Sequence, residues 1–76
     1  MATRKEVELT DEQAAILESW TRTTTMAQGM VTRARIILAL ADGETPMAVA
    51  HAQRVAPKTV HKWRNRFLEA GTEELA

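Results

Sequence analysis

Residues that start and stop helices divide this 76-residue chain into four segments. A threonine followed three residues later by glutamine is the capping-box pattern, which satisfies two free backbone N–H groups at a helix start. Proline is favoured at the first helical position, and glycine just after the last one. The start signals are Thr10 with Gln13, Thr25 with Gln28, Thr45 with Pro46, and Pro57; the stop signals are Gly43 and Gly71. We predict four helices, near residues 10–21, 26–42, 46–53 and 57–70.

Within these segments the apolar residues recur every three or four positions, as on one side of a helix. Nowhere does the chain alternate apolar and polar residues over the length of a strand. We therefore predict an all-α fold with one small core. Its expected members are Ala14, Leu17 and Trp20; Met30, Val31, Ala34, Ile37, Leu38 and Ala41; Met47, Val49 and Ala50; and Val60, Trp63 and Phe67.

The third and fourth segments have the internal spacing of a helix-turn-helix. Ala50 is a small residue at the point where two helices must approach closely, and Val55 follows five residues later, in the turn. Val60 and Trp63 follow ten and thirteen residues after Ala50, at the buried positions of the second helix. A short helix, a short turn and a longer helix form this motif. It would span residues 46–65, with a recognition helix near 57–70.

Two residues next to this turn depart from the usual pattern. The position of Arg54 is usually glycine because it requires a positive φ, and a non-glycine residue there costs about 1 kcal/mol. Ala56 lacks the hydroxyl that usually caps the recognition helix, so the start of that helix depends on Pro57 alone. We expect a left-handed Arg54 and a helix without a side-chain cap.

The charges are distributed unevenly although the net charge is zero. Residues 1–44 carry five basic and seven acidic side chains, whereas residues 45–76 carry five basic and three acidic ones. The stretch from Arg54 to Arg66 contains five basic residues and no acid. Because salt confines electrostatic interactions to roughly 10 Å, a local basic face can bind phosphate on a neutral domain.

On a helix that turns about 100° per residue, the polar residues of the fourth segment lie opposite its apolar ones. Lysine can donate to guanine, and asparagine can form paired hydrogen bonds with adenine, whereas flanking arginines suit phosphates. The expected base-contacting residues are Lys58, Thr59, His61, Lys62 and Asn65. The expected phosphate-contacting residues are Thr45, Arg54, Arg64 and Arg66.

Three stretches of the chain resemble the N-terminal region of insertion-sequence transposases of the mariner-like superfamily. They are LTDE at residues 9–12, RARIILALADG at residues 33–43 and TVHKWRNRF at residues 59–67. In that family this region is a homeodomain-like helix-turn-helix that binds terminal inverted repeats, and a metal-dependent nuclease domain follows it. The resemblance implies a bacterial domain in which the last three helices form the trihelical DNA-binding unit. It implies DNA binding without transposition.

Other chemistry has little support in the sequence. The chain has no cysteine, and His51 and His61 lie on different predicted helices without an obvious third ligand, so we expect no metal. Ser19 is the only serine and has no base near it in the sequence. We assign no catalytic residue, no cofactor and no small-molecule substrate. No stretch approaches the roughly 18 apolar residues of a membrane span, so we expect a cytoplasmic protein without a membrane partner.

These features predict a sequence-specific double-stranded DNA-binding domain over residues 9–76, preceded by a flexible arm over residues 1–8. It would be associated with the nucleoid. A homodimer on DNA stays open, as does the choice between an excised domain, a truncated transposase and an independent regulator. The alternative is a protein-interaction or regulatory module that does not bind DNA, which the zero net charge and the two unusual turn residues favour.

Overall fold

The computed structural model describes residues 7–23 and 25–75, and within them it confirms an all-α fold without strands. The predicted helices all form, with ends within two residues of the expected ones. A short 3-10 helix, η1, was not expected and follows the fourth helix directly. The elements are α1 (Asp11–Arg22), α2 (Gln28–Ala41), α3 (Pro46–Gln53), α4 (Pro57–Ala70) and η1 (Gly71–Leu75).

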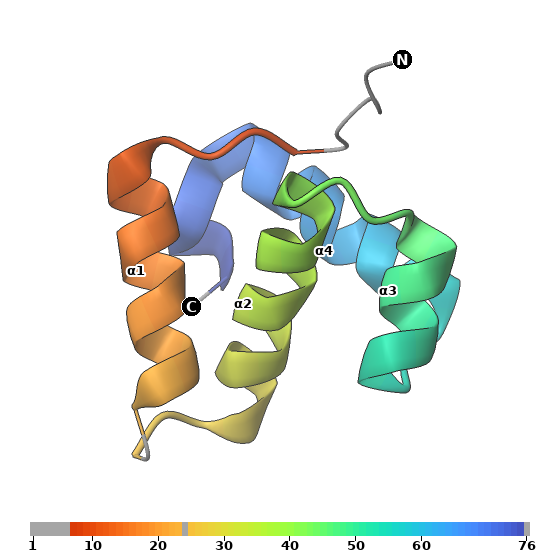
Figure 1. Cartoon of the computed structure of the whole chain (residues 1–76), viewed down its shortest axis with the longest axis horizontal. Helices are drawn as coiled ribbons and strands as arrows, with labels where there is room; N and C mark the ends of the chain where they lie inside the picture. The colour runs from red at the N-terminus through yellow and green to blue at the C-terminus, as the bar shows by residue number, and fades with distance from the viewer. Residues whose placement is uncertain (1–6, 24, 76) are drawn as a thin grey trace.

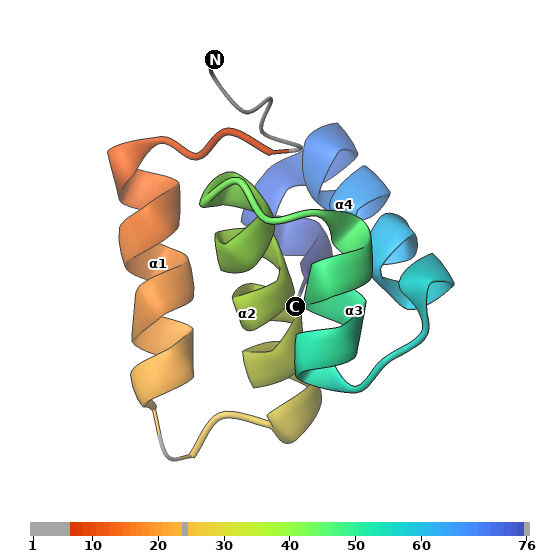
Figure 2. The same cartoon turned by 45° about the vertical axis from the view of Figure 1, so that its right-hand side comes forward.

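The helices pack around α2 (Figure 1). The helices α1 and α2 lie side by side and run in opposite directions. On the other side of α2 lies α3, and α4 contacts both α2 and α3 (Figure 2). The chain then folds back, so that η1 contacts α1, α2 and α4. The two helices of the helix-turn-helix, α3 and α4, thus pack against α2, and η1 packs against α1, α2 and α4.

The core draws side chains from every element. Leu17 of α1, Val49 of α3 and Val60 of α4 are fully buried, as is Leu75 of η1. The largest share comes from α2, whose buried residues are Val31, Ala34, Ile36, Ile37 and Leu40. Ile36 and Leu40 were not on the predicted stripe of that helix, whereas the expected Leu38 and Ala41 are only partly buried. Because α2 contacts all the other elements, more than one of its sides is enclosed.

Local hydrogen bonds confirm two of the three predicted threonine caps. The backbone N–H of Gln13 donates to Thr10 Oγ1 at 3.1 Å, and the N–H of Thr10 donates to Gln13 Oε1 at 3.1 Å. At α3 the N–H of Ala48 donates to Thr45 Oγ1 at 3.2 Å. The prediction was wrong for Thr25, which lies in a turn before α2. That helix begins at Gln28 after Ala27, without a side-chain cap.

The expected arm over residues 1–8 overlaps the folded domain. Residues 1–6 lie outside the described residues. Val7, however, is 1% exposed and belongs to the core cluster. The domain therefore begins at least two residues before the predicted boundary at Leu9.

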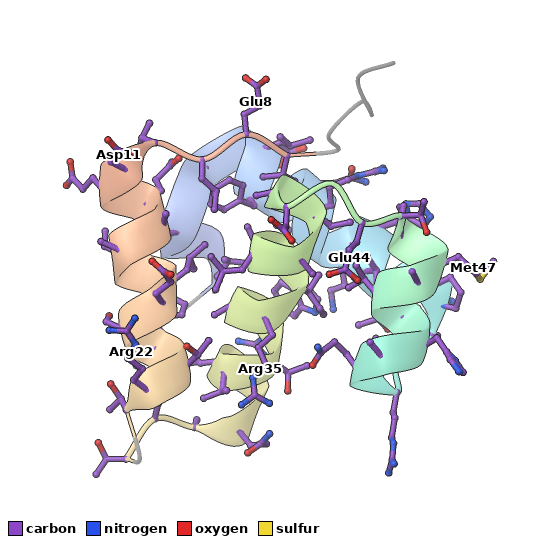
Figure 3. All side chains as sticks on the ribbon, viewed as in Figure 1. Glu8, Asp11, Arg22, Arg35, Glu44 and Met47 are labelled. Atoms are coloured by element: carbon purple, nitrogen blue, oxygen red, sulfur yellow. The ribbon has the colours of Figure 1, made fainter. Side chains whose placement is uncertain are left out.

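Met47 was expected in the core, and this prediction was wrong. Its side chain is 68% exposed and points away from the body of the protein (Figure 3). The helix α3 is short and packs through Val49 and Ala50. Met47 stands two residues before Val49, about 200° round the helix, so it cannot share that side.

Candidate nucleic-acid interface

The turn between α3 and α4 has the strained conformation that the sequence predicts. Arg54 has φ 57° and ψ 44°, which is the left-handed helical region. The N–H of Arg54 donates to the carbonyl oxygen of His51 at 3.3 Å, and that of Val55 to Ala50 at 3.0 Å. These bonds satisfy carbonyl groups at the end of α3, and they require the reversed backbone at Arg54. The geometry fixes the direction in which α4 leaves the turn.

No side chain caps the start of α4. Ala56 has the extended backbone of an N-cap residue, with φ −70° and ψ 146°, but its methyl group cannot accept a hydrogen bond. Pro57 occupies the first helical position, where its missing N–H matters least. The predicted absence of a cap is therefore confirmed, and backbone geometry alone sets the start of α4.

One side of α4 anchors it to the core. Val60 is fully buried and Phe67 is 4% exposed. Trp63 was expected to be as buried as these two, but it is only half-buried and packs at the edge of the core. The anchoring stripe is thus narrower than predicted, and part of the indole ring reaches the surface.

The opposite side of α4 is exposed and polar. Lys58, His61, Lys62 and Asn65 are all exposed, as the helical wheel predicts. Thr59 differs from them because it is half-buried on the flank of the helix. The structure brings the four exposed residues together on about two turns of one helix. Their contacts with bases stay a prediction.

The expected phosphate-contacting residues occupy different environments. Thr45, Arg54 and Arg66 are exposed, whereas Arg64 is half-buried. The guanidinium of Arg64 donates from Nε and Nη2 to Asn65 Oδ1, at 3.2 and 3.1 Å. This double hydrogen bond orients the amide of Asn65, because it fixes which end of the amide faces Arg64. Sequence reasoning had not linked these two neighbours.

Three cationic side chains surround the ring of Trp63. The distances to the ring centroid are 4.2 Å from Arg33 Cζ, 4.9 Å from Lys62 Nζ and 5.3 Å from Arg66 Cζ. We call these four residues the Trp63 cluster. All three distances lie within the range of cation–π attraction. No local pattern pointed to Arg33, because it lies on α2, thirty residues before the ring.

Glu69 was also missed by the sequence analysis. It is exposed, and it stands four residues after Asn65, on the same side of α4. A carboxylate repels phosphate, so it marks where the basic surface of the helix ends. The polar surface suited to an anionic partner is therefore the segment from Lys58 to Arg66.

Two other kinds of site are absent from the part of the chain that the structure describes. No group of three histidine, aspartate or glutamate side chains gathers there in a way that could hold a metal ion. None of the described helices combines the length and the apolar character needed to cross a membrane.

The fold and this surface define a class: a helix-turn-helix domain whose second helix presents basic and amide side chains. Comparison with protein families agrees with this class, because residues 29–76 match the model of the homeodomain-like domain. The match covers more than half of the chain, which therefore belongs to the homeodomain-like family, a family associated with DNA binding. It includes nearly all of α2 and everything after it, so it corresponds to the trihelical unit predicted for the last three helices. No curated protein and no solved structure matches the chain.

Proposed function

We propose that this domain binds double-stranded DNA in a sequence-specific manner, with α4 lying in the major groove. One observation supports this above the others. Val60 and Phe67 bury one side of α4, while Lys58, His61, Lys62 and Asn65 are exposed on the other. The major groove admits an α-helix and displays donors and acceptors that such side chains can read.

The proposed base contacts centre on Lys58 and Asn65, which face directly away from the core, with His61 about 50° to one side of them and Lys62 about 50° to the other. Lysine donates to the O6 and N7 atoms of guanine, and asparagine pairs with the N6 and N7 atoms of adenine. The pairing needs Asn65 Oδ1 to accept from adenine N6 and the amide N–H to donate to N7, so Oδ1 has to be released from Arg64 when the base is bound. Thr59 stands at the edge of this surface, on the side of Lys62.

The proposed phosphate contacts lie around it. Arg54 and Arg66 are exposed at the turn and on the flank of α4, and Thr45 stands at the start of α3. Arg64 is the fourth proposed phosphate contact. Contacts of this kind set the position of the protein on the duplex and carry no sequence information of their own.

The resemblance to mariner-like transposases supports a more specific role. By this proposal the domain is the module that binds terminal inverted repeats, or a stand-alone relative that acts as a small regulator. The role is binding rather than catalysis, in the bacterial cytoplasm and at the nucleoid. Binding as a homodimer belongs to the same proposal.

Selection from a pool of random duplexes tests the proposal directly. We expect a preferred site, and affinity for it that falls steeply as salt increases, with a slope near the number of phosphates neutralised. A palindromic site would indicate a dimer. Failure to enrich any sequence, with weak binding to all duplexes even at low salt, would contradict the proposal.

The exposed apolar residues favour a second candidate function, a protein-interaction module. Met47 is 68% exposed and Leu68 is 58% exposed. A docking surface built on them would depend little on salt, because burial of apolar area is not an electrostatic effect. The salt titration therefore separates the two candidates: a steep slope supports DNA binding, and a flat one supports docking.

A further inference from the structure

The Trp63 cluster gathers three positive charges from two helices around one ring. Arg33 comes from α2, whereas Lys62 and Arg66 come from α4. Among the side chains that the structure describes, which do not include that of Glu74, no carboxylate pairs with any of the three. The electron-rich face of the indole attracts each cation, but it carries no net charge to neutralise them. Among the described side chains, the positive charge of the cluster is therefore not compensated by a carboxylate.

Arg33 is held in place rather than extended into solvent. Its Nη1 donates to the backbone carbonyl oxygen of Leu75 at 3.1 Å. Its Nη2 lies beside Gly29, only 3.6 Å from where a Cβ would stand. The hydrogen bond uses one of the five N–H groups of the guanidinium, so others stay available to an anion. An arginine fixed in this way loses little side-chain freedom when it binds a phosphate.

The cluster lies on a flank of α4 rather than at the middle of its polar side. Lys62 and Arg66 are about 50° and 90° from that middle, in the direction of Trp63. When a helix lies in the major groove, its middle faces base edges and its flanks face the sugar–phosphate backbone. Because Arg33 stands over Trp63, α2 adds a cation to the same flank.

We propose that Arg33, Lys62 and Arg66, gathered around Trp63, form a clamp for a backbone phosphate of the bound duplex. The clamp rests on the proposed DNA-binding function and extends it in two ways. It adds α2 to the interface through Arg33. It also makes Lys62 a phosphate contact rather than a base contact.

Binding to a fluorescein-labelled duplex of random sequence, followed by anisotropy between about 50 and 200 mM salt, tests the clamp. The substitution Arg33→Gln should lower the slope of log affinity against log salt by about one. Arg35→Gln is the matched control, because Arg35 is exposed on the same helix but about 200° round it. Arg35 projects from the front of α2 in Figure 3, whereas α4 lies behind that helix. Its removal should leave the slope unchanged.

A lysine variant separates charge from structure. Both Arg33→Gln and Arg33→Lys remove the guanidinium that bonds to Leu75, so both should lower the thermal midpoint in circular dichroism. Only Arg33→Lys keeps the charge, and it should keep the wild-type slope. If Arg33→Gln does not fold, Lys62→Gln still tests the clamp, because Lys62 is exposed and makes no hydrogen bond that would be lost. It should weaken random and selected duplexes by the same factor.

The possible results distinguish the clamp from the broader proposal. If the wild-type domain binds no duplex at low salt, the proposed DNA-binding function fails and the clamp fails with it. If the wild type binds with a steep slope but Arg33→Gln matches Arg35→Gln, the clamp alone is overturned. A loss in Lys62→Gln that is confined to the selected duplex would also overturn it, since Lys62 would then read bases.

Discussion

The helix α1 begins with a complete capping box, in which Thr10 and Gln13 exchange two hydrogen bonds, whereas α4 begins after Ala56 with no side-chain cap. The approaches to the two helices differ as well. Arg54, just before α4, holds the left-handed backbone that glycine adopts more easily. The start of α1 thus has the residues that stabilise a helix locally, whereas the turn before α4 lacks both a side-chain cap and a glycine at its left-handed position.

The exposed sides of the two helices differ in the same way. On α1 the exposed charges include Asp11, Glu12 and Glu18, whereas α4 exposes Lys58, Lys62 and Arg66. Asp11 and Glu12 lie in the first turn of α1, where negative charge stabilises the helix through its dipole. The basic residues of α4 gain no such stabilisation from the dipole at the start of that helix. Departures from local rules are expected where a surface has a binding function.

The largest expected effect tests how firmly α4 is packed against the core. Phe67→Ala should lower the free energy of unfolding by about 3–5 kcal/mol, because a nearly buried ring leaves a cavity. The neighbouring substitution Leu68→Ala is the control and should change it by about 0.5 kcal/mol or less, since Leu68 is exposed. Urea denaturation followed by circular dichroism measures both. Equal effects would mean that α4 does not pack as the structure shows.

The next effect concerns binding. Asn65→Ala should weaken the selected duplex by about 1–3 kcal/mol, because a paired contact to one base is lost. Binding to random duplexes should change little. Competition anisotropy with both duplexes measures the difference, and Glu12→Ala on the exposed side of α1 is the control that should leave both unchanged. An equal loss on both duplexes would contradict the placement of Asn65 in the groove.

Exchanging the caps tests the contrast between the two helix starts. Thr10→Ala should destabilise the domain by about 1 kcal/mol, because the N–H of Gln13 loses its acceptor. Ala56→Ser should stabilise it by about 1 kcal/mol, since the backbone of Ala56 already has the extended geometry of a capping residue. Thermal unfolding measures both. If Ala56→Ser did not stabilise the domain, the missing side-chain cap at the start of α4 would carry no energetic cost.

Arg54→Gly should change stability and binding in opposite directions. Relief of the left-handed strain should stabilise the domain by about 1 kcal/mol. Loss of a phosphate contact should lower the salt slope of DNA binding by about one. In the control Gln53→Gly, one residue earlier in α3, a helical residue is replaced, so stability should fall by about 1 kcal/mol. If Arg54→Gly kept the wild-type slope, Arg54 would have no role at the phosphates.

The smallest expected effect lies in α2. Gly29→Ala should stabilise the domain by about 0.5 kcal/mol, because glycine weakens helices and the new methyl group would make only an ordinary contact with Arg33. Gly43→Ala is the contrasting control: it has φ 99° with open space around it, so backbone strain alone should destabilise the domain by about 1 kcal/mol. Chemical denaturation measures both. If both substitutions changed the free energy of unfolding in the same direction, the two glycines would not differ as their backbone conformations indicate.

Much of the fold could be predicted from short stretches of sequence. The observed bounds of α3 and α4 are the predicted ones, because proline and glycine act on neighbouring backbone groups. The left-handed Arg54 followed from its position in the motif. The cap at Thr25 failed because Ala27, two residues later, marks the true start of α2. A capping pattern shows where a helix can begin, and not that a helix does begin there.

Less of the candidate site could be predicted. The helical wheel of α4 placed Lys58, His61 and Asn65 correctly on the exposed side, because side-chain direction on one helix depends only on its periodicity. It could not show that Arg64 would hold the amide of Asn65. That contact depends on rotamers, which the sequence pattern does not specify.

The sequence by itself determined the four helices, their turn and the side of α4 that carries its polar residues. Only the tertiary structure decided that α2 would be enclosed on several sides and that Leu75 would return to the core. It also decided that Arg33 would stand over Trp63, thirty residues away, which leaves the indole half-buried among three cations. The physical reason is the range of each interaction. Caps, turns and periodicity act over a few neighbouring residues, whereas these contacts exist only once the helices have packed.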